Sequence, residues 1–302
     1  MTSGNPKPKI LVTGANGQLG RELHALAKSC KDFDFVFLSR ADMPVHHPEL
    51  VRHFMHTLQP QYLINCGAYT AVDRAETEKD KAFIVNGEAP GILAEICGVN
   101  KCQFIHISTD YVFNGEGNTP YKETDATGPK SVYGASKLMG EERALHNNPE
   151  SIIIRTSWVY SQYGNNFVKT MLRLMNEKQH ISVVNDQWGS PTWAAGLAAA
   201  IFQLIRKIEA GNKTINGIYH YCDGGITNWH AFALVIKEFT GSPCVVEAIP
   251  TSAYPTAAKR PAWSALDTTK IAGEGVQILP WETQLQICLN QLTAKNEANS
   301  SL

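Results

Sequence analysis

The feature that most constrains the fold of this chain is a glycine-rich turn between a short apolar run and an amphipathic stretch. The turn has the spacing GxxGxxG and follows the apolar residues 10–13 directly. With a strand before it and a helix after it, such a turn lets the backbone approach a pyrophosphate over the positive end of the helix. The pattern therefore predicts a dinucleotide-binding βαβ unit. Its expected cofactor-binding residues are Gly14, Asn16, Gly17, Gln18, Leu19 and Gly20.

Beyond this turn, short apolar runs alternate with longer amphipathic stretches, which is typical of βαβ units around a parallel sheet. The expected strands are residues 10–13, 35–38, 62–65, 104–108 and 152–156. The expected helices are residues 18–29, 48–58, parts of 78–98, and 132–146. The sequence therefore predicts an α/β fold, with a doubly wound, Rossmann-like parallel sheet and a smaller mixed substrate-binding lobe.

Glycines and prolines divide the chain into shorter pieces after residue 158, so the second half is expected to be organised differently. We expect a dinucleotide-binding domain over residues 1–157, completed by about 181–225. Residues 158–180 and 226–290 would form the substrate-binding lobe. The polar residues 291–302 are expected to be a disordered tail.

Composition argues against several classes of function. The 302 residues carry a formal net charge of −1, which gives no global field for holding nucleic acid or an anionic membrane. The seven cysteines contain no CxxC pair, which favours reduced thiols over a zinc or redox site. Neither a signal peptide nor a run of about 18 apolar residues is visible. We therefore expect a cytoplasmic globular protein with no nucleic-acid or membrane partner.

The residues after the second expected strand indicate which nicotinamide cofactor the turn would hold. An NAD-preferring protein usually has a carboxylate here for the ribose hydroxyls. This chain instead has Ser39 and Arg40, and a guanidinium suits the 2′-phosphate of NADPH. Asp42 lies close by and leaves NADH possible. NADPH is therefore the expected cofactor, bound in part by Ser39 and Arg40.

A YxxxK sequence in an expected helix supplies candidate catalytic residues. Tyr133 and Lys137 lie on one face of that helix, and Thr109 follows the fourth expected strand, at the sheet edge where such folds bind ligands. Reduction of a ketone needs a proton donor at the carbonyl oxygen. Tyrosine, with an ordinary pKa of about 10, needs a nearby cation for that task near neutral pH. We predict that Tyr133 donates the proton, that Lys137 lowers its pKa, and that Thr109 donates a hydrogen bond to the substrate oxygen.

Six longer stretches of sequence contain or accompany these candidate residues. They are residues 14–20 (GANGQLG), 65–76 (NCGAYTAVDRAE), 108–115 (STDYVFNG), 155–160 (RTSWVY), 186–192 (DQWGSPT) and 260–267 (RPAWSALD). Together they resemble the extended short-chain dehydrogenase/reductase family, and within it the branch of dTDP-4-dehydrorhamnose reductases. The resemblance runs from about residue 9 to residue 289. Its last two blocks are far more particular than the glycine turn.

The resemblance implies roles at the cofactor. Thr109, Tyr133 and Lys137 take the family's catalytic positions, and Tyr133 and Lys137 also contact the nicotinamide ribose. The loop after the third strand, Ala68, Tyr69 and Thr70, would meet the cofactor as well.

The resemblance also implies a substrate, a nucleotide-diphosphate sugar. Thr109, Asp110 and Trp158 match positions that contact the sugar, and Arg260 would supply positive charge for the diphosphate. The implied reaction is NADPH-dependent reduction of the 4-keto group of dTDP-4-dehydrorhamnose to give dTDP-L-rhamnose.

One departure from the family concerns metal. Some members bind a divalent cation through acidic side chains, one of them three residues after a Pro-Thr block, whereas this chain has Ala195 there, three residues after Thr192. We therefore expect no metal, and a monomer or a homodimer.

Two alternative functions stay open. One is another nucleotide-sugar 4-ketoreductase or epimerase of the same superfamily; an epimerase would show no net consumption of NADPH. The other is a non-catalytic binding subunit like the regulatory subunit of methionine adenosyltransferase. Retention of Tyr133, Lys137 and Thr109 argues against the second.

Overall fold

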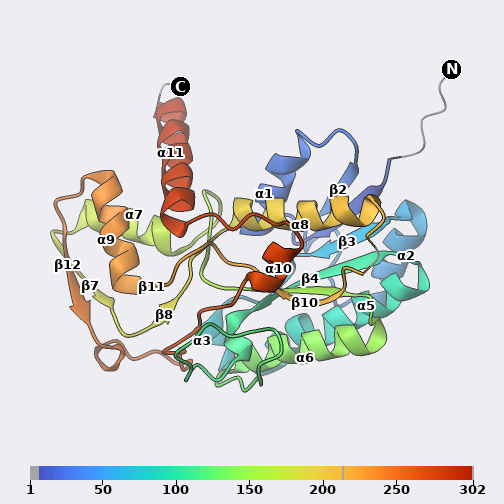
Figure 1. Ribbon diagram of the computed structural model, residues 1–302, viewed down its shortest axis with the longest axis horizontal. Helices are drawn as coiled ribbons and strands as arrows, with labels where there is room; N and C mark the ends of the chain where they lie inside the picture. Colours follow the sequence, from blue (N-terminus) through green and yellow to red (C-terminus); the bar gives the residue numbers. More distant parts are fainter. Residues whose placement is uncertain (1–6, 213, 301–302) are drawn as a thin grey trace.

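Within the described residues, six parallel strands form one sheet in the order β10-β5-β4-β3-β1-β2 (Figure 1). The computed structural model describes residues 7–212 and 214–300, and only the backbone of 295–300. Residues 1–6 of the expected first domain, and 301–302 of the expected tail, lie outside the described residues. The strands of the sheet are β1 (Lys9–Thr13), β2 (Asp34–Leu38), β3 (Tyr62–Asn65), β4 (Gln103–Thr109), β5 (Ile152–Thr156) and β10 (Gly217–His220).

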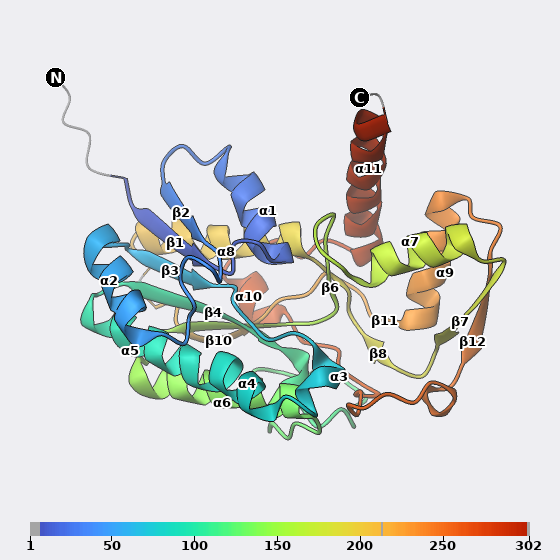
Figure 2. The ribbon, with the colours of Figure 1, turned by 180° about the vertical axis from the view of Figure 1, so that it is seen from behind.

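Helices cover both faces of this sheet (Figures 1 and 2). On one face lie α1 (Gln18–Ala27), α8 (Ala194–Glu209) and α10 (Thr269–Gly273), which share an apolar core with the alternate residues of the strands. On the other face lie α2 (Pro48–Leu58), α5 (Ala89–Val99) and α6 (Val132–Asn147). Because strand side chains alternate between the two faces, one sheet builds two separate cores. The predicted doubly wound α/β fold is confirmed.

The five predicted strands are all present, each within one residue of its expected bounds. The sixth, β10, was not predicted. Its residues Gly217, Ile218, Tyr219 and His220 are too few and too mixed to stand out from the surrounding turns. It pairs with β5 at the edge of the sheet.

One long apolar helix passes beneath the sheet. Residues 79–99 are continuous through α4 (Lys79–Phe83), a π-helical turn η1 (Ile84–Glu88) and α5. Among the described residues, this helix alone has the length and apolarity of a membrane span, but 56% of its apolar window is buried inside the protein. It packs along α6 and is a core helix (Figure 2).

A smaller lobe stands beside the carboxyl ends of the strands (Figure 1). Its core lies between α7 (Phe167–Glu177), α9 (Trp229–Thr240), the start of α11 (Trp281–Ser300) and a parallel pair of strands, β7 (His180–Val184) and β12 (Val245–Ile249). Short pairs join the lobe to the sheet: β6 (Val159–Tyr160) with β9 (Thr192–Trp193), and β8 (Trp188–Gly189) with β11 (Thr227–Asn228). The remaining short elements are α3 (Val72–Ala75), η2 (Asp110–Val112) and η3 (Thr251–Ala253).

Three expected boundaries need correction. The segment 181–225 was assigned to the nucleotide-binding layer, but β7 pairs with β12 inside the lobe. Conversely, α10 lies in the stretch assigned to the lobe but packs on the sheet through Ile271. The expected disordered tail is helical as far as Ser300, because buried Trp281, Leu285 and Cys288 anchor the start of α11.

Candidate active site

The glycine turn has the geometry that a pyrophosphate requires. Gly14 adopts a left-handed backbone with φ of +65°, and a Cβ atom there would lie 2.6 Å from backbone atoms of Cys66 and Gly67. Only glycine tolerates both conditions. Gly17 is the N-cap of α1 and has no side chain that could cap the first N–H groups. The turn therefore presents unpaired backbone donors at a helix N-terminus.

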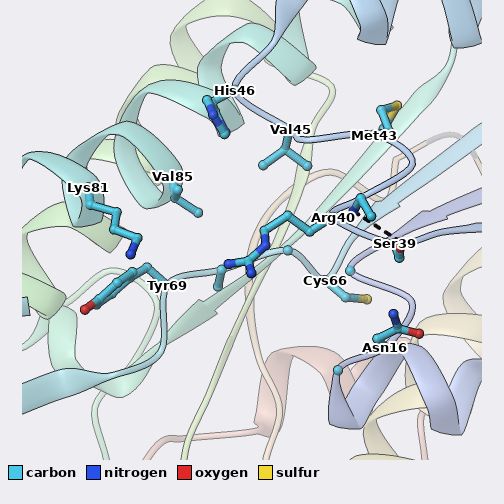
Figure 3. Close-up of a pocket in the computed structure, with 15 residues that line it drawn as sticks. Asn16, Ser39, Arg40, Met43, Val45, His46, Cys66, Tyr69, Lys81 and Val85 are labelled. Atoms are coloured by element: carbon cyan, nitrogen blue, oxygen red, sulfur yellow. Dashed lines mark hydrogen bonds between the residues drawn. The ribbon is translucent and has the colours of Figure 1, made fainter. Parts of the chain in front are cut away.

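A pocket of about 430 Å³ opens beside this turn (Figure 3). Seven of the thirteen expected cofactor-binding residues line it: Gly14, Asn16, Gly17, Ser39, Arg40, Ala68 and Tyr69. They come from the turn, from the end of β2 and from the loop after β3. The structure therefore brings together three segments that are far apart in the sequence.

The other six expected cofactor residues lie outside the lining of this pocket: Tyr133 and Lys137, which are described below, and four more. Leu19 is buried in the core, and Gly20 packs so closely on the Gly14 carbonyl that a Cβ would approach it to 2.5 Å. The Gln18 side chain accepts a hydrogen bond from Asn166 at 2.9 Å, and Thr70 is exposed. In these positions Leu19 and Gly20 shape the turn by packing.

Two cationic side chains, Arg40 and Lys81, line the far end of the pocket. Arg40 is exposed and extends across the pocket toward the loop of Tyr69, and Lys81 and His46 also line it (Figure 3). Asp42, the residue that could favour NADH, instead accepts hydrogen bonds from the backbone N–H and the hydroxyl of Ser39, at 2.8 and 2.6 Å. Among the described residues that line the pocket, none is acidic.

Helix α6 carries the YxxxK pair to the carboxyl end of β4. Ser131 caps its start by accepting from the Gly134 N–H at 3.1 Å. Gly134 approaches the Tyr111 carbonyl so closely that a Cβ would lie 2.2 Å away. The ring of Tyr133 packs edge-on against Tyr111, with centroids 5.6 Å apart. Lys137, one turn later, is only 2% exposed.

Thr109 and Asp110 stand where β4 ends. The Thr109 hydroxyl donates to the Asp110 carboxylate at 2.9 Å and accepts from the Tyr111 N–H at 3.2 Å. Burial raises the pKa of Asp110 to about 6, opposed by hydrogen bonds from Ser264 and Thr109. The same Thr109 hydroxyl contacts Tyr133. Thr109 therefore connects the predicted proton donor to a buried carboxyl group.

The proton affinity of Tyr133 departs from expectation. Burial raises its pKa well above the ordinary 10.0, the contact with Thr109 opposes the rise, and Asp110 and Tyr111 add to it. Lys137 is not among the groups that shift it. Its Nζ donates to the Ile107 carbonyl at 2.6 Å. That Lys137 lowers the pKa of Tyr133 during reduction stays a prediction.

Trp158 lies at the entrance to the lobe in a strained conformation. Its backbone φ is +49°, a left-handed value that is uncommon for a bulky residue. Its indole stacks on Trp229, with ring centroids 3.6 Å apart. Such strain persists only where surrounding structure enforces it, and it is frequent at binding sites.

A second pocket, of about 550 Å³, lies between the lobe and the end of β4. Trp229, Phe167, Tyr111 and Arg260 are among its lining residues. Arg260 is held at the rim by Asp73, at 2.7 Å, and by the Tyr111 hydroxyl, at 3.3 Å. Tyr133 itself lines neither of these two pockets, but its ring packs against Tyr111, which lines the second.

Sequence reasoning missed several residues of the site. Trp229 stacks on Trp158 from a helix with no recognisable motif. Asn65 and His106 are buried polar residues near the ends of apolar strands, and this signal was visible in the sequence. Ala195 lies on α8, and the described residues contain no group of three or more His, Cys, Asp or Glu side chains that could hold a metal.

Known proteins resemble this chain over most of its length. Residues 8–294 match the model of the RmlD substrate binding domain. The chain is 40% identical to a dTDP-4-dehydrorhamnose reductase of Aggregatibacter actinomycetemcomitans, covering 92% of this chain and 97% of that protein. It is also 40% identical to the spore coat polysaccharide biosynthesis protein SpsK of Bacillus subtilis, covering 94% and 97%. A crystal structure of dTDP-4-dehydrorhamnose reductase from Bacillus anthracis in complex with NADP superposes with a TM-score of 0.90 at 34% identity, covering 95% and 100%.

Proposed function

The chain belongs to the RmlD substrate binding domain family, which includes dTDP-4-dehydrorhamnose reductases, and we propose that it reduces dTDP-4-dehydrorhamnose to dTDP-L-rhamnose with NADPH. The observation that carries the proposal is the contact between Tyr133 and Thr109 at the carboxyl end of β4, where Tyr133 packs against Tyr111 of the second pocket. A dinucleotide and a nucleotide sugar would meet there.

The first pocket fits a dinucleotide phosphate. Gly14 leaves space that any Cβ would fill, and the start of α1 offers backbone donors to the pyrophosphate. Arg40 and Ser39 would hold the 2′-phosphate, because the pocket lining offers cationic and hydroxyl groups and no carboxylate among the described residues. When bound, the cofactor supplies the hydride.

The second pocket supports the assignment of the substrate. Trp229, which lines this pocket and stacks on Trp158 behind it, offers an apolar indole that suits a deoxysugar. Arg260 at the rim would face the diphosphate and form charge-assisted hydrogen bonds with it. The remaining volume, lined by the lobe, would hold the nucleoside.

The proton chemistry follows from the surroundings of Tyr133. Its raised pKa keeps the phenol protonated in the protein on its own. A general acid is most effective when its pKa lies nearer the operating pH, so reduction requires a positive charge near the phenol. On binding of the sugar, Thr109 would turn its single hydroxyl hydrogen from Asp110 to the keto oxygen and hold that oxygen beside the phenol. The Tyr133 hydroxyl proton then passes to the oxygen as the alcohol forms. The reacting groups need no metal ion to balance this step.

The decisive experiment is an assay of purified protein with dTDP-4-dehydrorhamnose and related keto sugars, using NADPH or NADH. We expect stoichiometric oxidation of NADPH and formation of dTDP-L-rhamnose. An epimerase would interconvert sugars without net loss of NADPH, and a non-catalytic subunit would bind ligands without turnover. Either result would reject the proposal.

We propose that the protein acts in the cytoplasm as a monomer or homodimer and needs no metal. A cytoplasmic site agrees with the reduced thiols of all seven cysteines in the described residues. The product would serve polysaccharide biosynthesis, which agrees with the name of the Bacillus subtilis relative.

A further inference from the structure

Three polar side chains form a row across the otherwise apolar face of the sheet that packs on α6. Thr13, Asn65 and His106 are register partners on the neighbouring strands β1, β3 and β4. Each is at most 1% exposed. The row begins beside the glycine turn and ends at Lys137, whose Nζ lies 3.2 Å from Nε2 of His106. Buried polar groups are costly unless each has a partner, so the direction of every hydrogen bond in this row has consequences.

The orientation of Asn65 is fixed by its neighbours. The backbone N–H of Gly67 lies 3.1 Å from Asn65 Oδ1, and the Thr13 hydroxyl donates to the same oxygen at 2.7 Å. A backbone N–H can only donate, so the amide oxygen must face it. The Asn65 NH₂ group therefore points at Nδ1 of His106, at 3.0 Å.

This orientation dictates the tautomer of His106. Because Asn65 donates to Nδ1, that nitrogen must accept, and a neutral ring then carries its hydrogen on Nε2. The ring is neutral because burial, and next the charge of Lys137, hold the pKa of His106 well below its ordinary value. The Nε2–H of His106 is consequently aimed at Nζ of Lys137.

An N–H aimed at Lys137 favours the amine over the ammonium. An amine accepts the Nε2–H hydrogen bond through its lone pair and still donates to the Ile107 carbonyl, whereas an ammonium has no lone pair to accept with. The other titratable groups that face Lys137 are Glu141, on its own helix, and Cys66, in the loop after β3. Glu141 is bound to Arg155 at 2.7 Å. Burial lowers the pKa of Lys137 to about 8, against the opposing effects of Glu141 and Cys66.

We propose that His106 is a positioning residue of the reductase site, whose Nε2–H, oriented by Asn65, sets the location of Lys137 Nζ and how readily that amine takes up a proton. Only the predicted effect of His106 on catalysis depends on the proposed function. The hydrogen-bond pattern itself is a property of the protein without ligands.

The first test reads the tautomer directly, by nitrogen NMR of protein labelled with ¹⁵N-histidine. His106 is expected to stay neutral from about pH 6 to 9 with its hydrogen on Nε2. His220 provides an internal control with the opposite tautomer, because its Nδ1 faces the Tyr121 carbonyl at 3.0 Å and must donate. A hydrogen on Nδ1 of His106, or a charged ring, would overturn the proposal whether or not the protein is a reductase.

The second test reverses the hydrogen-bond direction with Asn65→Asp. The new carboxylate still accepts hydrogen bonds from Gly67 and Thr13. Unlike the Asn65 NH₂ group, however, it cannot donate to His106 and can only accept. The hydrogen of the His106 ring therefore moves to Nδ1, and Nε2 becomes an acceptor that faces Lys137. We expect the NMR spectrum to show this switch. We also expect the alkaline limb of the kcat profile to move upward by about one pH unit or more, since the ammonium is then stabilised.

The matched control is Thr13→Val. It removes one hydrogen bond to Asn65 but leaves the one from the Gly67 N–H, which alone fixes the orientation of the amide. The tautomer of His106 and the alkaline limb of the pH profile of kcat should therefore both be unchanged. A comparable shift of the limb in Thr13→Val, or a shift in Asn65→Asp without a change of tautomer, contradicts the proposal. If neither keto sugars nor NADPH are turned over, the proposed function fails while the tautomer result stands on its own.

Discussion

The hydroxyl groups of Thr109 and Tyr133 are in contact where β4 ends, and the groups around them determine how readily Tyr133 gives up its proton. The Tyr133 side chain is partly buried, which disfavours its charged form and raises its pKa. The Thr109 hydroxyl already bridges to Asp110 and so has a defined orientation. The phenol is thus protonated and lies beside an oriented hydroxyl, but a lower pKa would make it a more effective general acid.

Replacing Tyr133 by Phe removes only the proton and leaves the ring against Tyr111. We expect turnover to fall by at least about 10², the contribution of a positioned general acid, with cofactor affinity largely unchanged. Steady-state kinetics and cofactor titration measure the two effects. Tyr62→Phe is the control, because its hydroxyl donates to Glu209 away from the site and its loss should spare turnover. Near-normal turnover in Tyr133→Phe would exclude this residue from the mechanism.

Replacing Arg40 by Ala should weaken NADPH binding more than NADH binding, because only NADPH carries the 2′-phosphate that Arg40 would contact. The comparison requires dissociation constants for both cofactors. Arg52→Ala removes the same charge from an exposed position on α2 and should affect neither. Equal losses for both cofactors, or no loss, would refute the assignment of NADPH.

At the scale of elements, α6 must be held firmly because it carries both Tyr133 and Lys137. Close packing contributes: a Cβ at Gly140 would lie 2.1 Å from the Asn86 carbonyl. An ion pair between Glu141 on α6 and Arg155 on β5 contributes too, with both side chains at most 3% exposed.

Glu141→Gln is therefore expected to lower the free energy of unfolding by roughly 3–5 kcal/mol, since Arg155 would keep its charge without a buried partner. Urea unfolding at neutral pH measures this. The exposed pair Arg173–Glu177 is the matched control, and Glu177→Gln should change the free energy of unfolding by less than about 1 kcal/mol. Equal effects of the two substitutions would show that the buried pair does not anchor α6.

The sequence predicts strands of this fold well and contacts between distant segments poorly. β3 and β5 are continuous buried apolar runs, so composition alone identifies them. β10 is a four-residue edge strand and owes its existence to pairing with β5, which no local pattern reveals. For the same reason the YxxxK spacing located Tyr133, whereas the stacking of Trp229 on Trp158 needed the folded chain.

On the scale of the whole molecule, one pocket opens beside the glycine turn of the sheet and the other is lined mainly by the lobe. No acidic cluster in the described residues could bind a cation there. The site that binds metal in some family members has Ala195 in this chain.

We therefore expect reductase activity to be insensitive to EDTA, because Mg²⁺ needs oxygen donors, usually carboxylates. A cation could still neutralise the diphosphate of the substrate in solution. The assay must accordingly compare chelated enzyme with enzyme resupplied with Mg²⁺ at constant ionic strength. Loss of activity on chelation with full recovery on adding Mg²⁺ would show that the protein holds a metal.

The late position of β10 and α8 in the chain bears on how the protein is made. Synthesis proceeds from the N-terminus at about 5–20 residues per second, so β1 to β5 leave the ribosome well before β10. Until then β5 is an open edge, and the apolar face of α1, with Leu19 and Leu23, lacks its cover from α8. An exposed edge and an uncovered apolar face are the features that chaperones bind and that drive aggregation. The nascent chain is thus most vulnerable while the lobe strand β7 and helix α7 are being translated, before the ribosome reaches the segments that close the sheet.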